Sequence, residues 1–150
     1  NVREYSRLMK ISPPTASKLL SEFNKEKLLL IEEDRNYIFY YANKNNKIFV
    51  DLSRIYWNLK LGNLVNFFNK NLINPTIILF GSLSKAETKN DSDIDISIIG
   101  HKKELDIKNF ENNLRRKIQL FFFSSIEDIK NKELANNIIN GYILEGRLRL

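Results

Sequence analysis

The pattern of hydrophobic and polar positions in the first 45 residues is helical up to about residue 27 and typical of strands after it. Residues 2–10 and 14–27 carry apolar side chains at helical spacing, and a proline-containing break separates them. Residues 28–32 and 37–42 are rich in aliphatic and aromatic side chains, and the short polar turn between them predicts a hairpin. Helix, tight turn, helix and hairpin is the order of a winged helix-turn-helix. The first helix of a complete motif is missing, so we expect a leading segment to be removed or absent.

The rest of the chain is predicted to mix helices with strands. Residues 46–72 continue the helical pattern, and Gly62 is where we expect a break in it. A near-continuous apolar run at residues 76–80 is typical of a buried strand. The remaining patterns predict a short helical stretch after Ser82, strands at 93–99, 117–123 and 142–144, and helices at 105–116 and 126–140. Together these elements indicate an α+β fold.

The long helical pattern divides the chain into parts. We expect a winged helix-turn-helix at 1–45, a connecting helix at 46–74 and a second domain at 75–150. A length of 150 residues suits this division, because it accommodates one medium domain or two very small ones. No internal repeat and no low-complexity linker interrupts the pattern.

The composition excludes several kinds of chemistry. The chain has no Cys and a single His, His101, which excludes disulfides, thiolate metal sites and sites built from several histidines. No apolar run approaches the roughly 20 residues that span a bilayer, and we identify no targeting peptide. We therefore expect a soluble, cytoplasmic protein without a membrane partner, in which carboxylates carry the chemistry. We interpret His101 as a solvated loop residue.

The net charge of +6 and a sequence pI near 9.5 are compatible with nucleic-acid binding. For a winged helix we expect double-stranded DNA as the partner, contacted by the polar face of the second helix and by the hairpin tip. The candidate DNA-contacting residues are Thr15, Ser17, Lys18, Lys25 and Arg35. The alternative is a small helical element that dimerises or contacts another protein.

Two acidic residues form the candidate site of the second domain. Asp93 and Asp95 lie two positions apart on a predicted strand, so both side chains point to the same face. Ile94 and Ile96 point to the opposite face, which can pack against helices. Neighbouring carboxylates repel each other, and Mg²⁺, a hard ion that takes oxygen ligands, relieves that repulsion.

A glycine-serine pair follows the preceding predicted strand. Gly81 lets a phosphate approach the backbone closely, and the start of the helix after it offers free amides to an anion. The hydroxyl of Ser82 adds a hydrogen-bond donor. The two groups of residues thus combine a binding site for a polyphosphate with one for a metal ion.

These residues resemble the signature of minimal nucleotidyltransferases in the DNA polymerase beta superfamily. The resemblance rests on Phe80-Gly81-Ser82-Leu83-Ser84-Lys85-Ala86-Glu87, on Ser92-Asp93-Ile94-Asp95, and on the closing segment Asn140-Gly141-Tyr142-Ile143-Leu144-Glu145-Gly146. The whole chain is similar to archaeal proteins that join a winged helix to such a domain. The resemblance implies that a mixed β-sheet flanked by helices forms the second domain.

The resemblance also implies a reaction and its ligands. Asp93 and Asp95 would bind the catalytic Mg²⁺ or Mn²⁺. The nucleotide would be bound by Gly81, Ser82, Lys85 and Ser92. The reaction would move a nucleoside monophosphate from a nucleoside triphosphate, expected to be ATP, to an acceptor hydroxyl and release pyrophosphate. The acceptor stays open among proteins, RNA, antibiotics and metabolites.

Two positions depart from the family pattern. Family members often have glycine where this chain has Ala86. Active members commonly take a third carboxylate from the strand after the next helix, and the matching position here is Gln119. A glutamine can offer a neutral oxygen to a metal ion, but it cannot act as a base. The residues that could substitute for the third carboxylate are Glu87, Asp91 and Glu111.

The departure at Gln119 keeps two other functions open. One is a transcription regulator that senses nucleotides after losing catalysis, and the other, from family resemblance, is an antitoxin-like partner of a HEPN-type toxin. Tyr56 and Trp57 are expected in the core or in a homodimer contact. The basic cluster Arg115–Lys117 guides phosphates or forms a solvated helix end, and Phe121–Phe123 is expected in the core.

Overall fold

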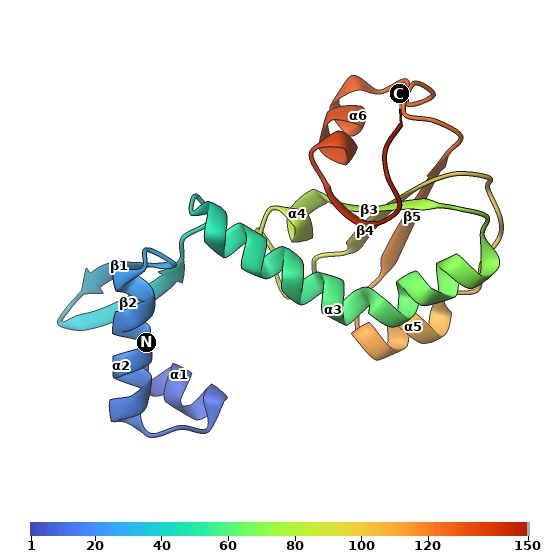
Figure 1. The fold of residues 1–150 in the computed structure, drawn as a ribbon. Helices are drawn as coiled ribbons and strands as arrows, with labels where there is room; N and C mark the ends of the chain where they lie inside the picture. Colours follow the sequence, from blue (N-terminus) through green and yellow to red (C-terminus); the bar gives the residue numbers. More distant parts are fainter. Residues whose placement is uncertain (150) are drawn as a thin grey trace. The chain divides into compact units, whose positions relative to one another are not determined.

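The computed structural model describes residues 1–149 and contains two compact units, Asn1–Asp51 and a second unit that begins at Leu52 (Figure 1). The helices are α1 (Val2–Met9), α2 (Pro13–Lys25), α3 (Lys47–Asn71), α4 (Gly81–Ser84), α5 (Lys108–Leu114) and α6 (Lys132–Ile139). The strands are β1 (Leu29–Asp34), β2 (Tyr37–Ala42), β3 (Thr76–Phe80), β4 (Ile94–Ile99), β5 (Ile118–Phe123) and β6 (Tyr142–Glu145). Within the described residues, no helix is both long enough and apolar enough to cross a membrane.

In the first unit, helices α1 and α2 precede an antiparallel hairpin of β1 and β2. Ser12 caps α2, because its side chain accepts a hydrogen bond from the backbone N–H of Thr15 at 3.3 Å. The hairpin closes through Arg35 and Asn36, whose φ angles of 46° and 67° form a two-residue turn. The predicted order of two helices and a hairpin is confirmed, and its assignment as a winged helix stays a prediction.

Helix α3 does not break at Gly62, contrary to expectation. All 25 residues from Lys47 to Asn71 are helical. A glycine costs a helix interior about 1 kcal/mol relative to alanine. Burial of the neighbouring side chains of Leu61 and Leu64 outweighs that cost, because each contributes about 1.5–3 kcal/mol when fully buried.

The second unit is built on a four-stranded mixed sheet in the order β5-β4-β3-β6. Strands β4 and β5 are parallel, and β3 is antiparallel to both β4 and β6. This arrangement agrees with the mixed α+β fold expected for the domain. It also makes β4, which carries Asp95, an inner strand with a partner on each side.

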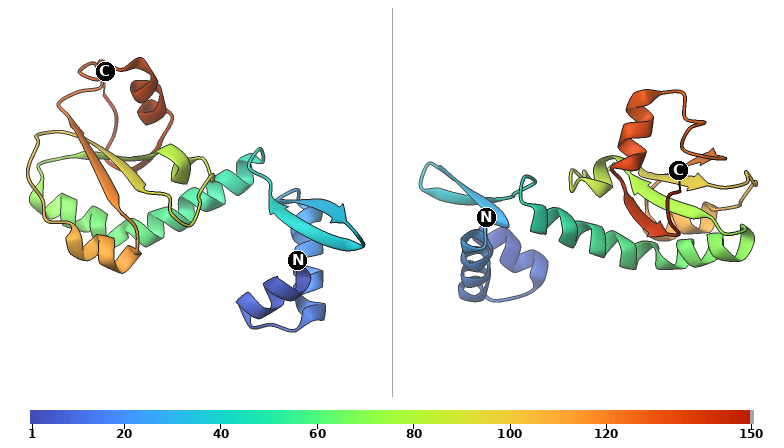
Figure 2. Two further views of the ribbon diagram at one scale, coloured as in Figure 1. Left: turned by 180° about the vertical axis from the view of Figure 1, so that it is seen from behind. Right: turned by 45° about the horizontal axis from the view of Figure 1, so that its top comes forward.

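Each face of this sheet has its own hydrophobic core. On one face, Ile77 and Leu79 of β3 pack with buried residues of α3 and with half-buried residues of α5. On the other face, Ile78 and Phe80 pack with Ile138 of α6. Figures 1 and 2 show α3 and α5 on one side of the sheet and α6 on the other. The period of 2 along β3 thus distributes its side chains between two helical layers.

Helices α5 and α6 are shorter than the predicted ranges 105–116 and 126–140. Arg115 takes a left-handed φ of 52° directly after α5 and so ends the helix. Asn131 caps α6 at its start by accepting a hydrogen bond from the backbone N–H of Leu134 at 3.0 Å. The prediction used apolar spacing alone, and this spacing continues into the loops on either side of both helices. The predicted ranges were therefore too long.

The Phe121–Phe123 run is less buried than predicted. All three rings pack against the two cores, yet each stays half-buried. The reason is the position of β5 at an edge of the sheet, where one side of the strand has no neighbour. Trp57 in α3, by contrast, belongs to the core and is only 8% exposed, while Tyr56 is exposed.

Candidate active site

Asp93 and Asp95 lie at the beginning of β4. Asp95 pairs in register with Phe80 on β3 and with Gln119 on β5. Asp93 comes immediately before the strand, two positions from Asp95, where an extended chain directs side chains to the same face. Ile94 between them is fully buried in the core beneath α3. Both carboxylates therefore lie on the face of the sheet opposite α3.

The glycine of the Gly81-Ser82 pair lies directly against the Asp95 carboxylate. Gly81 begins α4 with a φ of 71°, a left-handed conformation that other residues rarely adopt. A Cβ atom on Gly81 would collide with Oδ2 of Asp95 and lie 3.2 Å from its Cγ. The missing side chain is therefore what allows the turn between β3 and α4 to approach this carboxylate. Ser82, the next residue, is half-buried.

Ala86 lies just after α4, at the position where the sequence resemblance led us to expect a glycine. Ala86 takes a left-handed φ of 57° and is buried. Alanine in this region costs about 1–2 kcal/mol relative to the right-handed conformation. The chain thus keeps the conformation that glycine adopts freely, with an alanine methyl group packed in its place.

The electrostatics of the site favour a cation. Burial, and then the nearby charge of Asp93, raise the pKa of Asp95 above its ordinary value of 3.8. The Asp95 carboxyl is therefore harder to ionise in the protein than it is in water. A divalent ion that takes oxygen ligands would relieve the repulsion, so this donor set fits Mg²⁺ or Mn²⁺. Among residues 1–149, no cluster of three or more His, Asp or Glu side chains is assembled for a metal ion.

Gln119 lies beside the carboxylate pair. Its Nε2 donates a hydrogen bond of 2.6 Å to Oδ2 of Asp93, and its backbone pairs with that of Asp95. A neutral amide stabilises the Asp93 carboxylate, but it cannot take up a proton or balance the charge of a metal ion. Of the candidate substitutes, Glu111 is engaged elsewhere, because its Oε1 accepts a hydrogen bond from the backbone N–H of Ile118 at 2.9 Å.

The other residues expected to bind nucleotide make hydrogen bonds within the protein. Nζ of Lys85 donates to Oδ1 of Asn137 in α6 at 2.9 Å. Oγ of Ser92 accepts from the backbone N–H of Lys89 at 2.8 Å and so closes a turn before the aspartates. The two other candidate substitutes for the third carboxylate, both exposed in the segment between α4 and β4, are Glu87 and Asp91.

Arg116 makes contacts near the site that the sequence did not predict. Its Nη1 donates to the backbone oxygen of Lys89 at 3.0 Å and to the backbone oxygen of Ser92. Its guanidinium carbon lies 5.5 Å from the centroid of the Trp57 ring. In the sequence, the only indication of this role was the basic cluster Arg115–Lys117. The spacing of these residues could not distinguish such a role from a solvated helix end.

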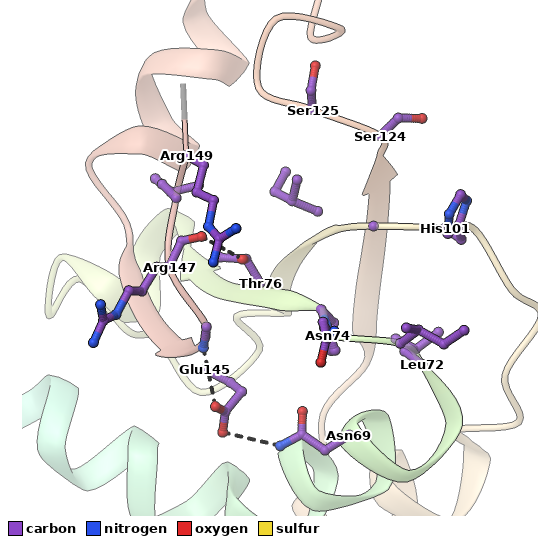
Figure 3. A pocket seen from close by; sticks show the side chains of 16 residues that line it. Asn69, Leu72, Asn74, Thr76, His101, Ser124, Ser125, Glu145, Arg147 and Arg149 are labelled. Atoms are coloured by element: carbon purple, nitrogen blue, oxygen red, sulfur yellow. Dashed lines mark hydrogen bonds between the residues drawn. The ribbon is translucent and has the colours of Figure 1, made fainter.

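A cavity of about 1130 Å³ lies at the other end of the sheet (Figure 3). The ends of β4 and β5, the beginning of β3 and the chain after β6 line it, together with exposed His101. Its acidic residue, Glu145, accepts a hydrogen bond from Asn69 at 3.2 Å. Neither Asp93 nor Asp95 lines this cavity, so the cavity is separate from the candidate carboxylate pair.

The five candidate DNA contacts are exposed in the first unit. Four of them lie on α2 and the fifth lies in the hairpin turn: Thr15, Ser17, Lys18, Lys25 and Arg35. The hydroxyl of Thr15 also shares a hydrogen bond of 2.8 Å with the hydroxyl of Ser12. Their exposure leaves all five side chains accessible to a partner.

Comparison with known proteins gives one informative match. The family model described as Polymerase beta, Nucleotidyltransferase matches residues 62–147, more than half of the chain. The matched region begins inside α3 and includes both Gly81 and the two aspartates. No curated protein and no solved structure matches the chain.

Proposed function

The chain belongs to the polymerase beta nucleotidyltransferase family, and we propose that its second unit is a metal-dependent transferase. It transfers a nucleoside monophosphate from a nucleoside triphosphate, with ATP as the expected donor, to an acceptor hydroxyl. The observation that carries this proposal is the close approach of Gly81 to the Asp95 carboxylate. It brings a turn that can face phosphates next to a group that can hold a cation.

The four residues at this contact have different roles in the proposal. Asp93 and Asp95 hold the divalent ion, since their side chains lie on one face at the start of β4. Gly81 and Ser82 bind phosphate oxygens through the backbone and the serine hydroxyl. When bound, the ion neutralises phosphate charge and orients the triphosphate.

Lys85 and Ser92 have secondary roles in nucleotide binding. Lys85 would have to exchange its hydrogen bond with Asn137 for a phosphate contact. Ser92 supports the turn at Lys89, so it orients the aspartates more than it contacts the nucleotide. We therefore expect their substitution to weaken binding less than substitution of either aspartate.

The transfer forms one bond and breaks another. The acceptor hydroxyl oxygen forms a bond to the α-phosphorus, and the bond from that phosphorus to the α,β-bridging oxygen breaks. Pyrophosphate leaves with the bond electrons. The hydroxyl proton passes to solvent, because the proposal assigns both Asp93 and Asp95 to the ion and the amide of Gln119 beside Asp93 cannot accept a proton.

Nucleotide binding is tested by thermal unfolding with ATP and Mg²⁺. We expect saturating ligand to raise Tm by several degrees, since ligand at about 100 times its Kd stabilises by about 2.7 kcal/mol. The double variant Asp93→Asn plus Asp95→Asn should abolish the shift. Asp34→Asn, an exposed aspartate at the end of β1 in the first unit, is the control and should keep the shift. No shift in the wild-type protein would refute nucleotide binding at this site.

A second function is favoured by Gln119. Its hydrogen bond to Asp93 puts a neutral amide at the carboxylate pair, so the domain is suited to bind MgATP without rapid transfer. The protein would then be a regulator that senses nucleotides. Labelled nucleoside triphosphates, incubated with candidate acceptors, separate the two functions: label transferred to an acceptor supports the enzyme, and binding without transfer supports the sensor.

Both functions include DNA binding by the first unit. The support is the order of its elements, two helices and a hairpin, and the exposure of the polar residues on α2 and of Arg35. A basic helix that enters a groove contacts phosphates mainly through lysine and arginine. If the protein is a sensor, nucleotide binding by the second unit would regulate transcription through the DNA bound by the first unit.

A further inference from the structure

The segment between α4 and β4 leads directly into the aspartate pair and has no regular secondary structure. Residues 87–91 of this segment are exposed. Within it, Lys89 and Ser92 close a turn through two hydrogen bonds, one to the Ser92 side chain and one to the Lys89 carbonyl. A short exposed turn of this kind opens readily unless other parts of the protein hold it.

Arg116 supplies that attachment. Its Nη1 donates to the carbonyl oxygens of Lys89 and Ser92, the two ends of the turn. A guanidinium can bridge two acceptors because its donors are fixed in one plane. The other contact of the guanidinium is with Trp57, which is 8% exposed and belongs to the main core. The turn is therefore joined to a rigid part of the second unit.

The chain around Arg116 holds Asp93 from three directions. Before Asp93, the Ser92 carbonyl is bound by the Arg116 side chain. After Asp93, the backbone N–H of Ile94 donates to the carbonyl of Lys117 at 2.9 Å. The Asp93 carboxylate itself accepts from Gln119. One short run of residues thus determines the position of the backbone and of the side chain.

We infer that Arg116 is a positioning residue for Asp93. In this role it acts through the turn at residues 89–92, which it holds so that the Asp93 carboxylate meets the metal and nucleotide in place. This role rests on the proposed function, because positioning matters only if Asp93 has a ligand. The attachment of the turn itself does not depend on that function and can be measured separately.

The attachment is tested by hydrogen exchange in the protein without ligand. In Arg116→Gln, the backbone amides of Lys89 and Ser92, which donate within the turn, should exchange about tenfold faster, because the turn opens more often once its hydrogen bonds to a charged donor are lost. Arg115→Gln, the exposed neighbour with the same loss of charge, should exchange as the wild type does. The emission of Trp57, the one tryptophan in the chain, should change in Arg116→Gln and stay unchanged in Arg115→Gln. Equal exchange in the two variants would overturn the inference.

The consequence for the site is tested by calorimetric titration with MgATP. Arg116→Gln should raise the Kd for MgATP about tenfold, and Arg115→Gln by no more than about twofold, since it removes the same charge without releasing the turn. If the wild type does not bind MgATP, the proposed function fails while the exchange result still decides the attachment. Faster exchange with an unchanged Kd would overturn the positioning role.

If the Arg116→Gln variant does not fold, hydrogen exchange and the Kd for MgATP can be measured on the Arg116→Lys variant instead. Lysine retains the charge and can reach one carbonyl, but it lacks the planar donors that bridge two. We expect exchange of the Lys89 and Ser92 amides and the Kd for MgATP to lie between those of wild type and Arg116→Gln, with a Tm within a few degrees of wild type. A lysine variant identical to wild type in both exchange and Kd would contradict the bridging geometry.

Discussion

Gly81 and Asp95 are so close that a single methyl group on the glycine would collide with Oδ2 of the aspartate. The two residues are brought together by neighbouring strands, since Gly81 directly follows Phe80, the last residue of β3, which pairs with Asp95 of β4. The glycine therefore serves two needs at once, a left-handed φ of 71° and space for a carboxylate. Both needs follow from the tight turn that leaves β3.

Gly81→Ala is expected to destabilise the protein and to impair the site. The backbone strain and the displacement of Asp95 should lower the free energy of unfolding by about 1–3 kcal/mol, and the Tm shift produced by MgATP should be lost. Gly62→Ala is the matched control: nothing lies within 4 Å of the added Cβ, and alanine in the helix should stabilise by up to about 1 kcal/mol. Thermal unfolding with and without MgATP measures both variants. Normal stability and a normal MgATP response in Gly81→Ala would contradict the close contact.

Gln119→Glu is expected to increase metal dependence. The substitution replaces the amide that donates to Asp93 with a carboxylate of the same length. Without divalent ions, the added repulsion should reduce stability by about 1–3 kcal/mol, and Mg²⁺ should restore it. Release of pyrophosphate from ATP should rise with this third carboxylate in place.

Gln119→Ala controls for loss of the hydrogen bond without added charge. It should be modestly destabilised with and without Mg²⁺ and should gain no pyrophosphate release. Equal responses of the Gln119→Glu and Gln119→Ala variants to Mg²⁺ would argue that residue 119 does not face the bound metal.

The stability of the protein should depend on pH through Asp95. Because the pKa of Asp95 is raised above 3.8 by burial and by the charge of Asp93, the folded state binds this proton more tightly than the unfolded state. The resulting stabilisation is present below pH 3.8 and is lost as the pH rises through the raised pKa. The Asp95→Asn variant has no carboxyl group to ionise at this position, so it does not lose this stabilisation. As the pH rises from 3.8 through the raised pKa of Asp95, the stability of the variant relative to wild type should therefore increase, and above that pKa it should level off. Denaturant unfolding at several pH values in EDTA measures this difference, and a constant difference between the two proteins across the pH range would contradict the raised pKa of Asp95.

Two buried serines should respond oppositely to alanine. Ser97 is fully buried on β4, and its Oγ has no hydrogen-bond partner among the described residues, so Ser97→Ala should raise stability by up to about 1 kcal/mol. Ser84 is equally buried, but its Oγ donates to the carbonyl of Gly81 at 2.9 Å. Ser84→Ala should therefore lower stability by about 1 kcal/mol. Denaturant midpoints compare the pair, and a loss of similar size in both would show that Ser97 finds a partner in solution.

Lys18 and Lys25 are expected to contribute to DNA affinity through phosphates. Replacing both with alanine should weaken binding to mixed-sequence duplex DNA and reduce the slope of log K against log salt by about 2. The control is the double variant Lys44→Ala plus Lys47→Ala, which replaces two exposed lysines of the same unit that lie outside α2. It should reduce the slope of log K against log salt by less. Binding that is indifferent to salt and to Lys18 and Lys25 would rule out α2 as a phosphate-contacting helix.

Local periodicity in the sequence was sufficient for several features of this protein. The spacing of apolar residues located α3 to within one residue at each end and placed β3 at 76–80 as observed. Alternation around Ile94 put Asp93 and Asp95 on one face of the sheet, opposite to the face on which Ile94 packs beneath α3. These features depend on neighbours within a few residues, whose side-chain directions follow from helix or strand geometry alone.

The tertiary structure decided which distant residues meet. Gln119 reaches Asp93 across 26 positions of the chain because β4 and β5 pair in parallel with a particular register. Arg116 holds the turn before Asp93 because the left-handed Arg115 ends α5 at that point, and helix α3 continues through Gly62 because its neighbours are buried on the sheet. Register and burial are properties of the assembled sheet, so no local pattern in the sequence contains them.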